Sequence, residues 1–213
     1  MFGVALLAGR RAGARRPSAI IRFGFALLSL GMAILIPVMP RAESGWYLVI
    51  PLLIAGSGLG LLVSQLNNYT LAPISEERVS EAAGVNSAAG SFGLSFGLAF
   101  AGAIMLATLS IVFTDMADSS AVLSQPEQQR VAQALKDDAE VMSNTQLDEL
   151  LAGQPADVQA EILRINTDAR PRALQVALAI PLLASLIGLF NGFRMTRMPD
   201  PEPSAAVEGA AFG

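Results

Sequence analysis

The sequence contains neither cysteine nor histidine among its 213 residues. The absence of cysteine excludes a disulfide framework and thiolate metal sites, and the absence of histidine removes the commonest general base and the commonest zinc ligand. Hydrolytic triads and most metalloenzyme mechanisms are therefore excluded, although chemistry on carboxylates stays open. We expect a protein that is not an enzyme and that holds no cofactor and no metal ion.

Charge is also scarce. Charged residues make up 15% of the chain and hydrophobic residues 53%, whereas a soluble domain carries about a quarter charged residues. The few charges are clustered, so long stretches have none. The net charge of −4 averages over unlike regions and indicates no partner by itself. We expect a lipid bilayer around the chain, and no nucleic-acid partner.

Four charge-poor stretches are long enough to cross a bilayer, which takes roughly 20 mostly apolar residues. They cover residues 20–39, 46–68, 84–113 and 171–194. The sequence therefore predicts an all-α integral membrane protein with about four transmembrane helices. The alternative, a set of buried helices in a soluble protein, would leave too few polar residues to cover them.

The charges between the stretches predict an orientation. Residues 10–16 hold four arginines, and positive residues in short loops stay in the cytoplasm. We therefore expect residues 1–18 to be the end of a preceding helix and a cytoplasmic arginine-rich loop, because the apolar residues 1–8 are too few to span. The protein would be multi-pass in the cell (inner or plasma) membrane, with a disordered cytoplasmic tail at 195–213.

The long connection at 114–170 has a different composition. It holds eleven Asp and Glu residues against four Arg and Lys residues. Apolar residues recur in it at helical spacing, which predicts two or three short amphipathic helices on the extracytoplasmic side. The segment is either a partner-binding domain or a surface cap or spacer, and its composition favours the cap or spacer.

The stretch 84–113 has the most informative pattern. Its small residues recur every three or four positions and so share one helix face, which we call the small-residue face: Gly90, Gly93, Gly97 and Ala101. Such faces let two helix backbones approach closely in lipid. The face is either a tight packing surface or a sliding and rocking interface, with tight packing favoured, and both interpretations require a partner helix.

Polar residues inside the stretches are few. Gln65, Asn68 and Asn86 are candidates for lining a cavity, since lipid cannot satisfy polar groups. The alternative is a position at a helix end, wetted by lipid headgroups. Ionisable residues are absent from the depth of all four stretches, so a proton-coupling residue would have to lie elsewhere in the molecule.

Two segments together resemble the major facilitator superfamily, most closely its fourteen-helix drug:proton antiporter branch. Residues 7–16 resemble a degenerate copy of the cytoplasmic loop signature of that family. Gly13, Arg15 and Arg16 match the end of the signature, while its Asp is missing. Residues 58–102 resemble the segment in which a glycine-rich helix leads through a Pro-, Glu- and Arg-containing loop into a small-residue helix.

The resemblance implies that the chain supplies the last four helices of a C-terminal bundle. Its partners would be the missing N-terminal helix bundle, in the same transporter or in a separate chain, and a small amphipathic substrate. The implied function is drug efflux by alternating access, driven by proton antiport, of the kind that gives multidrug resistance. The chain would not transport by itself. The alternative is a small four-helix scaffold or assembly protein that binds a partner through its acidic outer loop.

Overall fold

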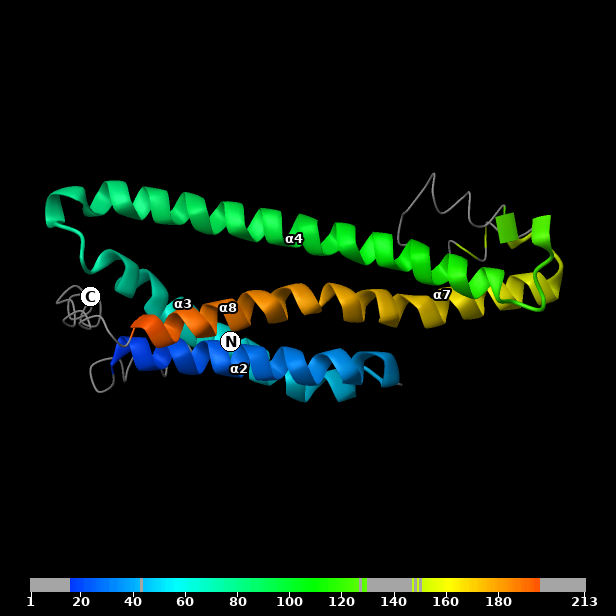
Figure 1. Cartoon of the computed structure of the whole chain (residues 1–213), viewed down its shortest axis with the longest axis horizontal. Helices are drawn as coiled ribbons and strands as arrows, with labels where there is room; N and C mark the ends of the chain where they lie inside the picture. Colours follow the sequence, from blue (N-terminus) through cyan, green and yellow to red (C-terminus); the bar gives the residue numbers. More distant parts are fainter. Residues whose placement is uncertain are drawn as a thin grey trace. The chain divides into compact units, whose positions relative to one another are not determined.

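The computed structural model describes residues 16–42, 44–126, 128–129, 147, 149 and 151–195. Its helices are α2 (Pro17–Val38), α3 (Trp46–Leu71), α4 (Val79–Asp118), α7 (Ala156–Ala177) and α8 (Ala179–Met195), with the 3-10 turns η1 (Met39–Arg41) and η2 (Glu76–Arg78) (Figure 1). The described part of the chain contains no strand. The prediction of an all-α protein is confirmed.

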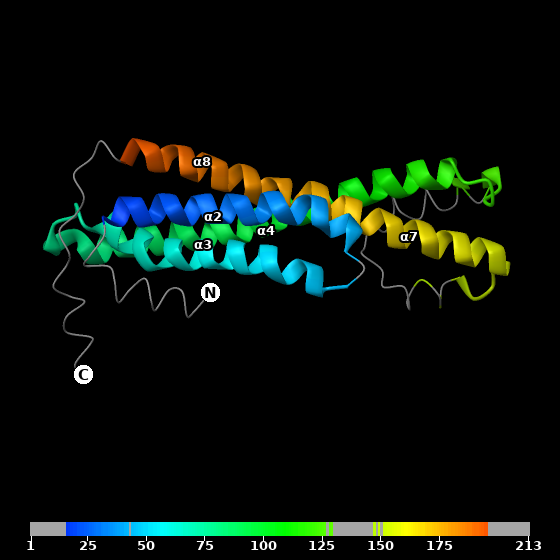
Figure 2. The same ribbon diagram turned by 90° about the horizontal axis from the view of Figure 1, so that it is seen from below.

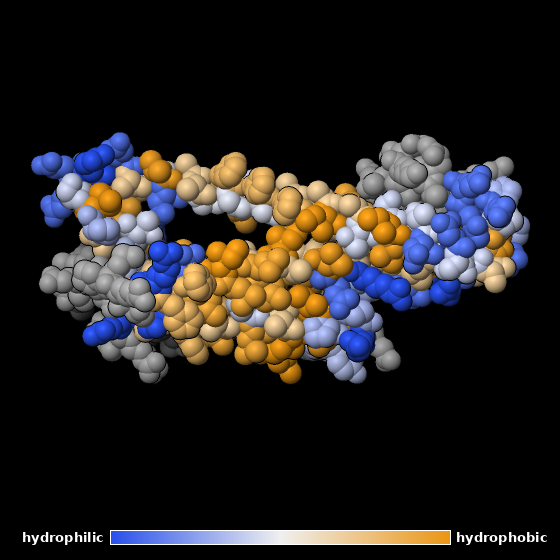
Figure 3. Space-filling view, in the orientation of Figure 1, coloured by the Kyte–Doolittle hydropathy of each residue, from blue (hydrophilic) through white to orange (hydrophobic). Residues whose placement is uncertain are grey.

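Four helical stretches are long and apolar enough to cross a membrane: Pro17–Arg41, Trp46–Leu71, Glu76–Asp118 and Ala156–Met195. Many of their large apolar side chains point outward, including Leu94 and Leu98 on α4, each 74% exposed. On the bundle of α2, α3 and α8, apolar residues form a band with hydrophilic residues at both ends (Figure 3). This distribution suits a surface that faces lipid, and the predicted fold class is confirmed.

The described residues form two compact units. The first unit contains α2 up to Leu35, Glu43–Phe96 with α3 and the first half of α4, and α8 from Pro181. The second unit contains Ile36–Ala42 and Gly97–Ile180, which bring together η1, the second half of α4 and α7.

In the first unit, α2 lies between α3 and α8 (Figure 2). It meets α3 through small residues. A Cβ atom added to Gly31 would lie 2.5 Å from the backbone nitrogen of Ala55, and one added to Gly58 would lie 2.5 Å from the carbonyl oxygen of Gly24. The two backbones therefore touch, as small residues permit in membrane helices.

Helix α2 meets α8 along another face. Ser29 hydrogen-bonds Ser185, with 2.8 Å between the two hydroxyl oxygens. The ring of Phe25 occupies the space beside Gly188, and the stem of Arg22 occupies the space beside Gly192. These positions advance by three or four residues on α8 while they retreat by three or four on α2. The pairing is therefore antiparallel, with one face of each helix in contact.

In the second unit, the C-terminal half of α4 packs against α7, and we call this pair the α4–α7 hairpin. Its core is made of apolar side chains that recur at helical spacing: Leu109, Phe113, Ala117, Leu123, Val158, Ile162, Ile165, Ala169 and Ala173. Helix α7 also contacts η1. The hairpin has an interior like that of a small soluble helical protein.

The hairpin changes the boundaries expected from the sequence. Helix α4 continues past residue 113 to Asp118, and α7 begins at Ala156, inside the segment expected to be a loop with short helices. At about 1.5 Å per residue, the 40 residues of α4 span about 60 Å, twice the thickness of the hydrocarbon core. Helix α4 is therefore longer than a single crossing of the hydrocarbon core requires. The amphipathic pattern expected from 131 to 146 lies outside the described residues.

Candidate functional site

The small-residue face of α4 has no neighbour at its three glycines within the described part of the chain. Gly90 and Gly93 are exposed, while Gly97 and Ala101 are half-buried. A Cβ atom added to Gly90, Gly93 or Gly97 would meet no atom within 4 Å. Gly24 and Gly31 of α2 and Gly58 of α3 lie against a neighbouring helix, but within the described residues the three glycines of α4 do not. That this face packs against a partner helix stays a prediction.

The predicted cavity-lining residues have different surroundings. Gln65 on α3 is buried, with 4% of its surface exposed. Asn86 near the start of α4 is half-buried, and its Nδ2 donates a hydrogen bond to Oδ1 of Asn67 at 2.7 Å. Asn68 belongs to α3, but its side chain lies outside the described residues. This hydrogen bond makes Asn67 a link between α3 and α4.

The arginine-rich loop is described only at its end. Gly13 and Arg15 lie outside the described residues. Arg16 directly precedes α2, and its carbonyl oxygen accepts hydrogen bonds from the backbone nitrogens of Ala19 and Ile20. The loop therefore leads directly into the first turn of α2.

Sequence reasoning missed the buried serine pair between α2 and α8. Ser29 and Ser185 are 7% and 2% exposed. The hydroxyl of Ser185 donates to the carbonyl oxygen of Leu182 at 2.8 Å. A serine hydroxyl has one hydrogen, so Ser29 is the donor in the bond between the two hydroxyls. The available signal was a serine on each apolar helix, because membrane helices use such residues to bind one another.

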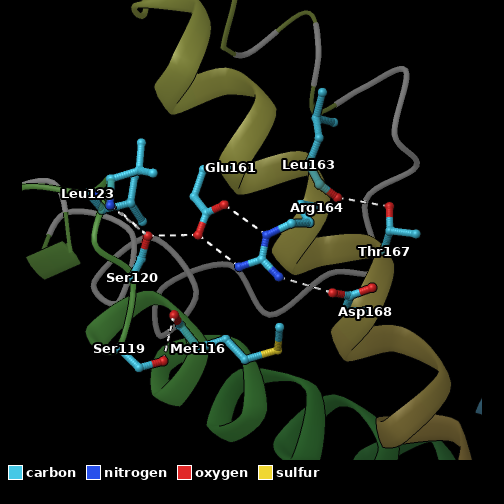
Figure 4. Close-up of polar contacts among 10 residues, drawn as sticks. Met116, Ser119, Ser120, Leu123, Glu161, Leu163, Arg164, Thr167 and Asp168 are labelled. Atoms are coloured by element: carbon cyan, nitrogen blue, oxygen red, sulfur yellow. Dashed lines mark hydrogen bonds and ion pairs between the residues drawn. The ribbon is translucent and has the colours of Figure 1, made fainter.

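A polar network joins the end of α4 to α7 (Figure 4). The hydroxyl of Ser120 donates to Glu161 at 2.7 Å. Arg164 donates to both oxygens of Glu161 at 2.8 Å and to Asp168 at 3.2 Å. The same Ser120 oxygen accepts the backbone N–H of Val122 at 3.2 Å. The network therefore fixes the turn that follows α4 against one face of α7.

The electrostatics of this network stabilise the ionised carboxylate. Residues 157–172 carry six charged side chains, which places Glu161 outside the membrane-spanning part of the last helix. The hydrogen bonds from Arg164, and then the one from Ser120, lower the pKa of Glu161 from 4.5 to about 2. Glu161 is therefore an anion at every physiological pH.

Arg170 is a described side chain whose buried donor atoms lack hydrogen-bond partners. Its Nε and Nη2 atoms are buried and have no hydrogen-bond partner among the residues that the structure describes. Buried polar groups are normally paired, because leaving them without a partner costs free energy. An acceptor for this guanidinium would therefore have to come from outside the described residues.

The described residues hold no group of three or more acidic side chains placed to bind a metal ion. The polar atoms gather instead at helix contacts: the serine pair, the asparagine pair and the network of the hairpin. Such an arrangement joins helices and can line a polar path between them.

One curated protein with significant similarity is a probable actinorhodin transporter of Streptomyces coelicolor. The two sequences are 26% identical over 126 residues. The aligned stretch covers 58% of this chain and 22% of that relative, so the match spans less than a quarter of the length of the relative. No family model matches the chain, and no solved structure is significantly similar to it. Together with its four apolar helices, this similarity supports a multi-pass membrane protein.

Proposed function

We propose that the chain forms the C-terminal part of a secondary-active membrane exporter of amphipathic small molecules, of the major facilitator kind. The observation that carries this proposal is the similarity to a probable actinorhodin transporter across a stretch that contains apolar spanning helices. Alternating access needs two bundles that move around a central site. Four helices provide one side of such a pathway, so the chain by itself does not transport.

The open face of α4 supports a second bundle. Gly90, Gly93 and Gly97 have no neighbouring side chain within the described residues, and small residues in lipid are where another helix can approach. A helix of the missing bundle would cover this face. The polar residues Gln65, Asn67 and Asn86 would then line the path on the side of this chain.

Proton coupling would be carried by residues elsewhere in the transporter. The described helices α2, α3 and α8 contain no Asp or Glu, and the acidic residues of α4 lie in its first turn and its last turn. Coupling needs an ionisable group at membrane depth. The antiport chemistry is therefore assigned to the missing bundle.

Cross-linking tests the proposed partner directly, because the natural chain has no cysteine. A Gly93→Cys variant in native membranes, labelled with a maleimide that carries a photoreactive benzophenone, should form a cross-link to another helix on illumination. Phe92→Cys is the matched control, since that side chain is 70% exposed and lies about 200° around the helix from Gly90. Equal cross-linking from both positions, or none from Gly93→Cys, would contradict the proposal.

Transport itself is the second test. Vesicles containing the 213-residue chain should show no gradient-driven dye export, and vesicles that also contain the complementary N-terminal bundle should show it. Export by the chain without a partner would contradict the two-bundle proposal.

A non-transport scaffold is the second candidate, and the α4–α7 hairpin favours it. The hairpin extends beyond the membrane and has its own core and polar network, as a partner-binding element would. Replacing residues 124–154 by a short glycine–serine linker separates the two functions. Loss of partner association with intact membrane insertion would favour the scaffold, while unchanged association would favour the transporter.

A further inference from the structure

We propose that Arg22 forms a binding site for the headgroup of an anionic phospholipid, in the angle between α2 and α8. The site does not depend on what the protein transports. It requires a guanidinium placed at the level of lipid phosphates, a surface that holds it there, and no acidic group that already neutralises it. The described residues around Arg22 supply all three.

Arg22 lies at the level of the lipid headgroups. It is the sixth residue of α2, which has 22 residues and a length of about 33 Å, close to the thickness of the hydrocarbon core. Helical side chains lean toward the N-terminus. The Nε atom of Arg22 donates to the carbonyl oxygen of Ser18 at 3.4 Å, so the side chain turns back toward the start of α2. Its apolar stem stays in the bilayer while its charge reaches the interface.

Helix α8 provides the surface that holds the guanidinium. A Cβ atom added to Gly192 would lie 2.8 Å from Cγ of Arg22, so the glycine leaves room for the arginine stem. The Cζ atom of Arg22 lies 5.9 Å from the centroid of the Phe193 ring, within the range of a cation–π contact. Two adjacent residues of α8 therefore fix both the stem and the head of the side chain.

No described acidic group neutralises Arg22. Helices α2, α3 and α8 contain no Asp or Glu. The ion pairs among the described residues involve Arg78 and Arg164, and not Arg22. Neither Nη atom of Arg22 has a hydrogen-bond partner in the part of the chain that the structure describes. Arg194, in the last turn of α8, adds a second positive charge two residues beyond Gly192.

The guanidinium of Arg22 favours a phosphate as the ligand. A guanidinium presents paired N–H groups that match two oxygens of a phosphate, and this geometry strengthens as water is excluded. At the membrane interface the phosphate of a lipid headgroup is the anion present at high local concentration, and anionic lipids add a net charge that attracts basic residues. The free Nη atoms of Arg22 are therefore matched to an anionic lipid.

Native mass spectrometry of the whole purified chain tests the site with a defined lipid. The protein is titrated with phosphatidylglycerol or with zwitterionic phosphatidylcholine, and the lipid-bound fraction is measured. We expect preferential retention of phosphatidylglycerol, weakened about tenfold or more in Arg22→Gln because a charge-assisted hydrogen bond is lost. Phe193→Leu keeps the charge and removes the ring, and it should weaken binding by a smaller factor.

Arg41→Gln is the matched control. Arg41 lies at the other end of α2, and its Nη1 atom already donates to the carbonyl oxygen of Pro37 at 2.7 Å. The Arg41→Gln variant should bind phosphatidylglycerol as the natural chain does. A circular dichroism spectrum of each variant shows that its helices are intact.

Three results would overturn the proposal. If Arg22→Gln and Phe193→Leu both retain phosphatidylglycerol like the natural chain, Arg22 is not the site. Equal retention of the two lipids would show that a net lipid charge is not recognised, leaving Arg22 for a carboxylate of a partner protein. Displacement of the lipid by millimolar inorganic phosphate would mean that a free phosphate, and not a lipid, is the ligand.

Discussion

At the scale of single residues, the serine pair shows how two apolar helices are matched. Neither hydroxyl can reach water, because Ser29 and Ser185 are both buried. Each finds an acceptor, since Ser29 donates to Ser185 and Ser185 donates to its own helix. The bond therefore specifies which faces of α2 and α8 meet, while the surrounding apolar packing would tolerate several rotations.

A double-mutant cycle measures the strength of that bond. Ser29→Ala, Ser185→Ala and the double variant should show a coupling of about 0.6 kcal/mol, the usual value for interhelical hydrogen bonds in membranes. Reversible unfolding in mixed micelles provides the free energies. Ser64→Ala is the control, because that hydroxyl donates only to Leu61 of its own helix. Additive effects of the two substitutions would mean that the bond contributes nothing.

For Arg170 we predict that a substitution does not lower the stability of the chain. Its buried Nε and Nη2 atoms have no partner in the described part of the chain, so Arg170→Met removes a cost. The free energy of unfolding of the chain should stay constant or rise by about 1 kcal/mol. In contrast, Arg164→Met should lower the thermal midpoint, since it breaks the bonds to Glu161. A lower midpoint for Arg170→Met would show that this side chain has found an acceptor.

The carboxylate of Glu161 predicts how the hairpin responds to acid. Its pKa is lowered from 4.5 to about 2 in the folded state by the hydrogen bonds from Arg164 and Ser120. The stabilisation from this group is therefore fully present above pH 4.5 and is lost as the pH falls from there through about 2. Thermal unfolding followed from pH 7 to pH 2 should show this decline. Glu161→Gln should be less stable at pH 7 and should lose this part of the decline, and an unchanged pH profile would contradict the assignment.

At the scale of helices, glycines separate into those that touch a neighbour and those that do not. Gly31→Leu should push α2 away from α3, because even a Cβ atom at this position would meet the backbone of Ala55. Overpacking of this kind costs about 1–3 kcal/mol or more. Gly90→Leu is the matched control and should leave the stability of the purified chain unchanged, since it meets no atom. Equal losses for both variants would mean that α4 has a neighbour within this chain.

The sequence predicted the helices well and their contacts poorly. Charge-free runs located all four spans, because the bilayer imposes a length and a polarity on each. The end of α4 was expected near residue 113, where acidic residues begin, but Phe113 and Ala117 pack into the hairpin core and carry the helix to Asp118. The spacing of seven between Gly24 and Gly31 did not predict their contact with α3. Every span contains small residues, and only the neighbouring helix decides which of them lie in a contact.

At the scale of the whole molecule, the sequence similarity to a transporter has to be considered together with the contacts between the helices. The chain aligns with 22% of a probable transporter, and polar residues among the described residues form hydrogen bonds between helices. Gln65 and Asn86 were predicted from the sequence to line a cavity, because polar residues stand out in apolar helices. The structure buries Gln65 and pairs Asn86 with Asn67, and a role in lining a cavity stays a prediction.

The positions of the arginines predict an orientation for the chain, and this prediction can be tested because the sequence has no cysteine. Arg16 and Arg194 lie at the ends of α2 and α8 that pair with each other, and positive charge favours the cytoplasm. We expect Ser124→Cys, beyond the end of α4, to react with an impermeant maleimide on intact cells. Ser75→Cys, in the connection between α3 and α4, should react only after the cells are permeabilised.

The two cysteines test whether α4 crosses the membrane and in which direction. Both residues are exposed, so differences in labelling report the side of the membrane and not burial. They are separated by the single helix α4, whose apolar length requires them to lie on opposite sides. The reverse pattern would place the α4–α7 hairpin in the cytoplasm and contradict the orientation. Labelling of both on intact cells would mean that α4 does not cross the bilayer, which would contradict the four-span fold itself.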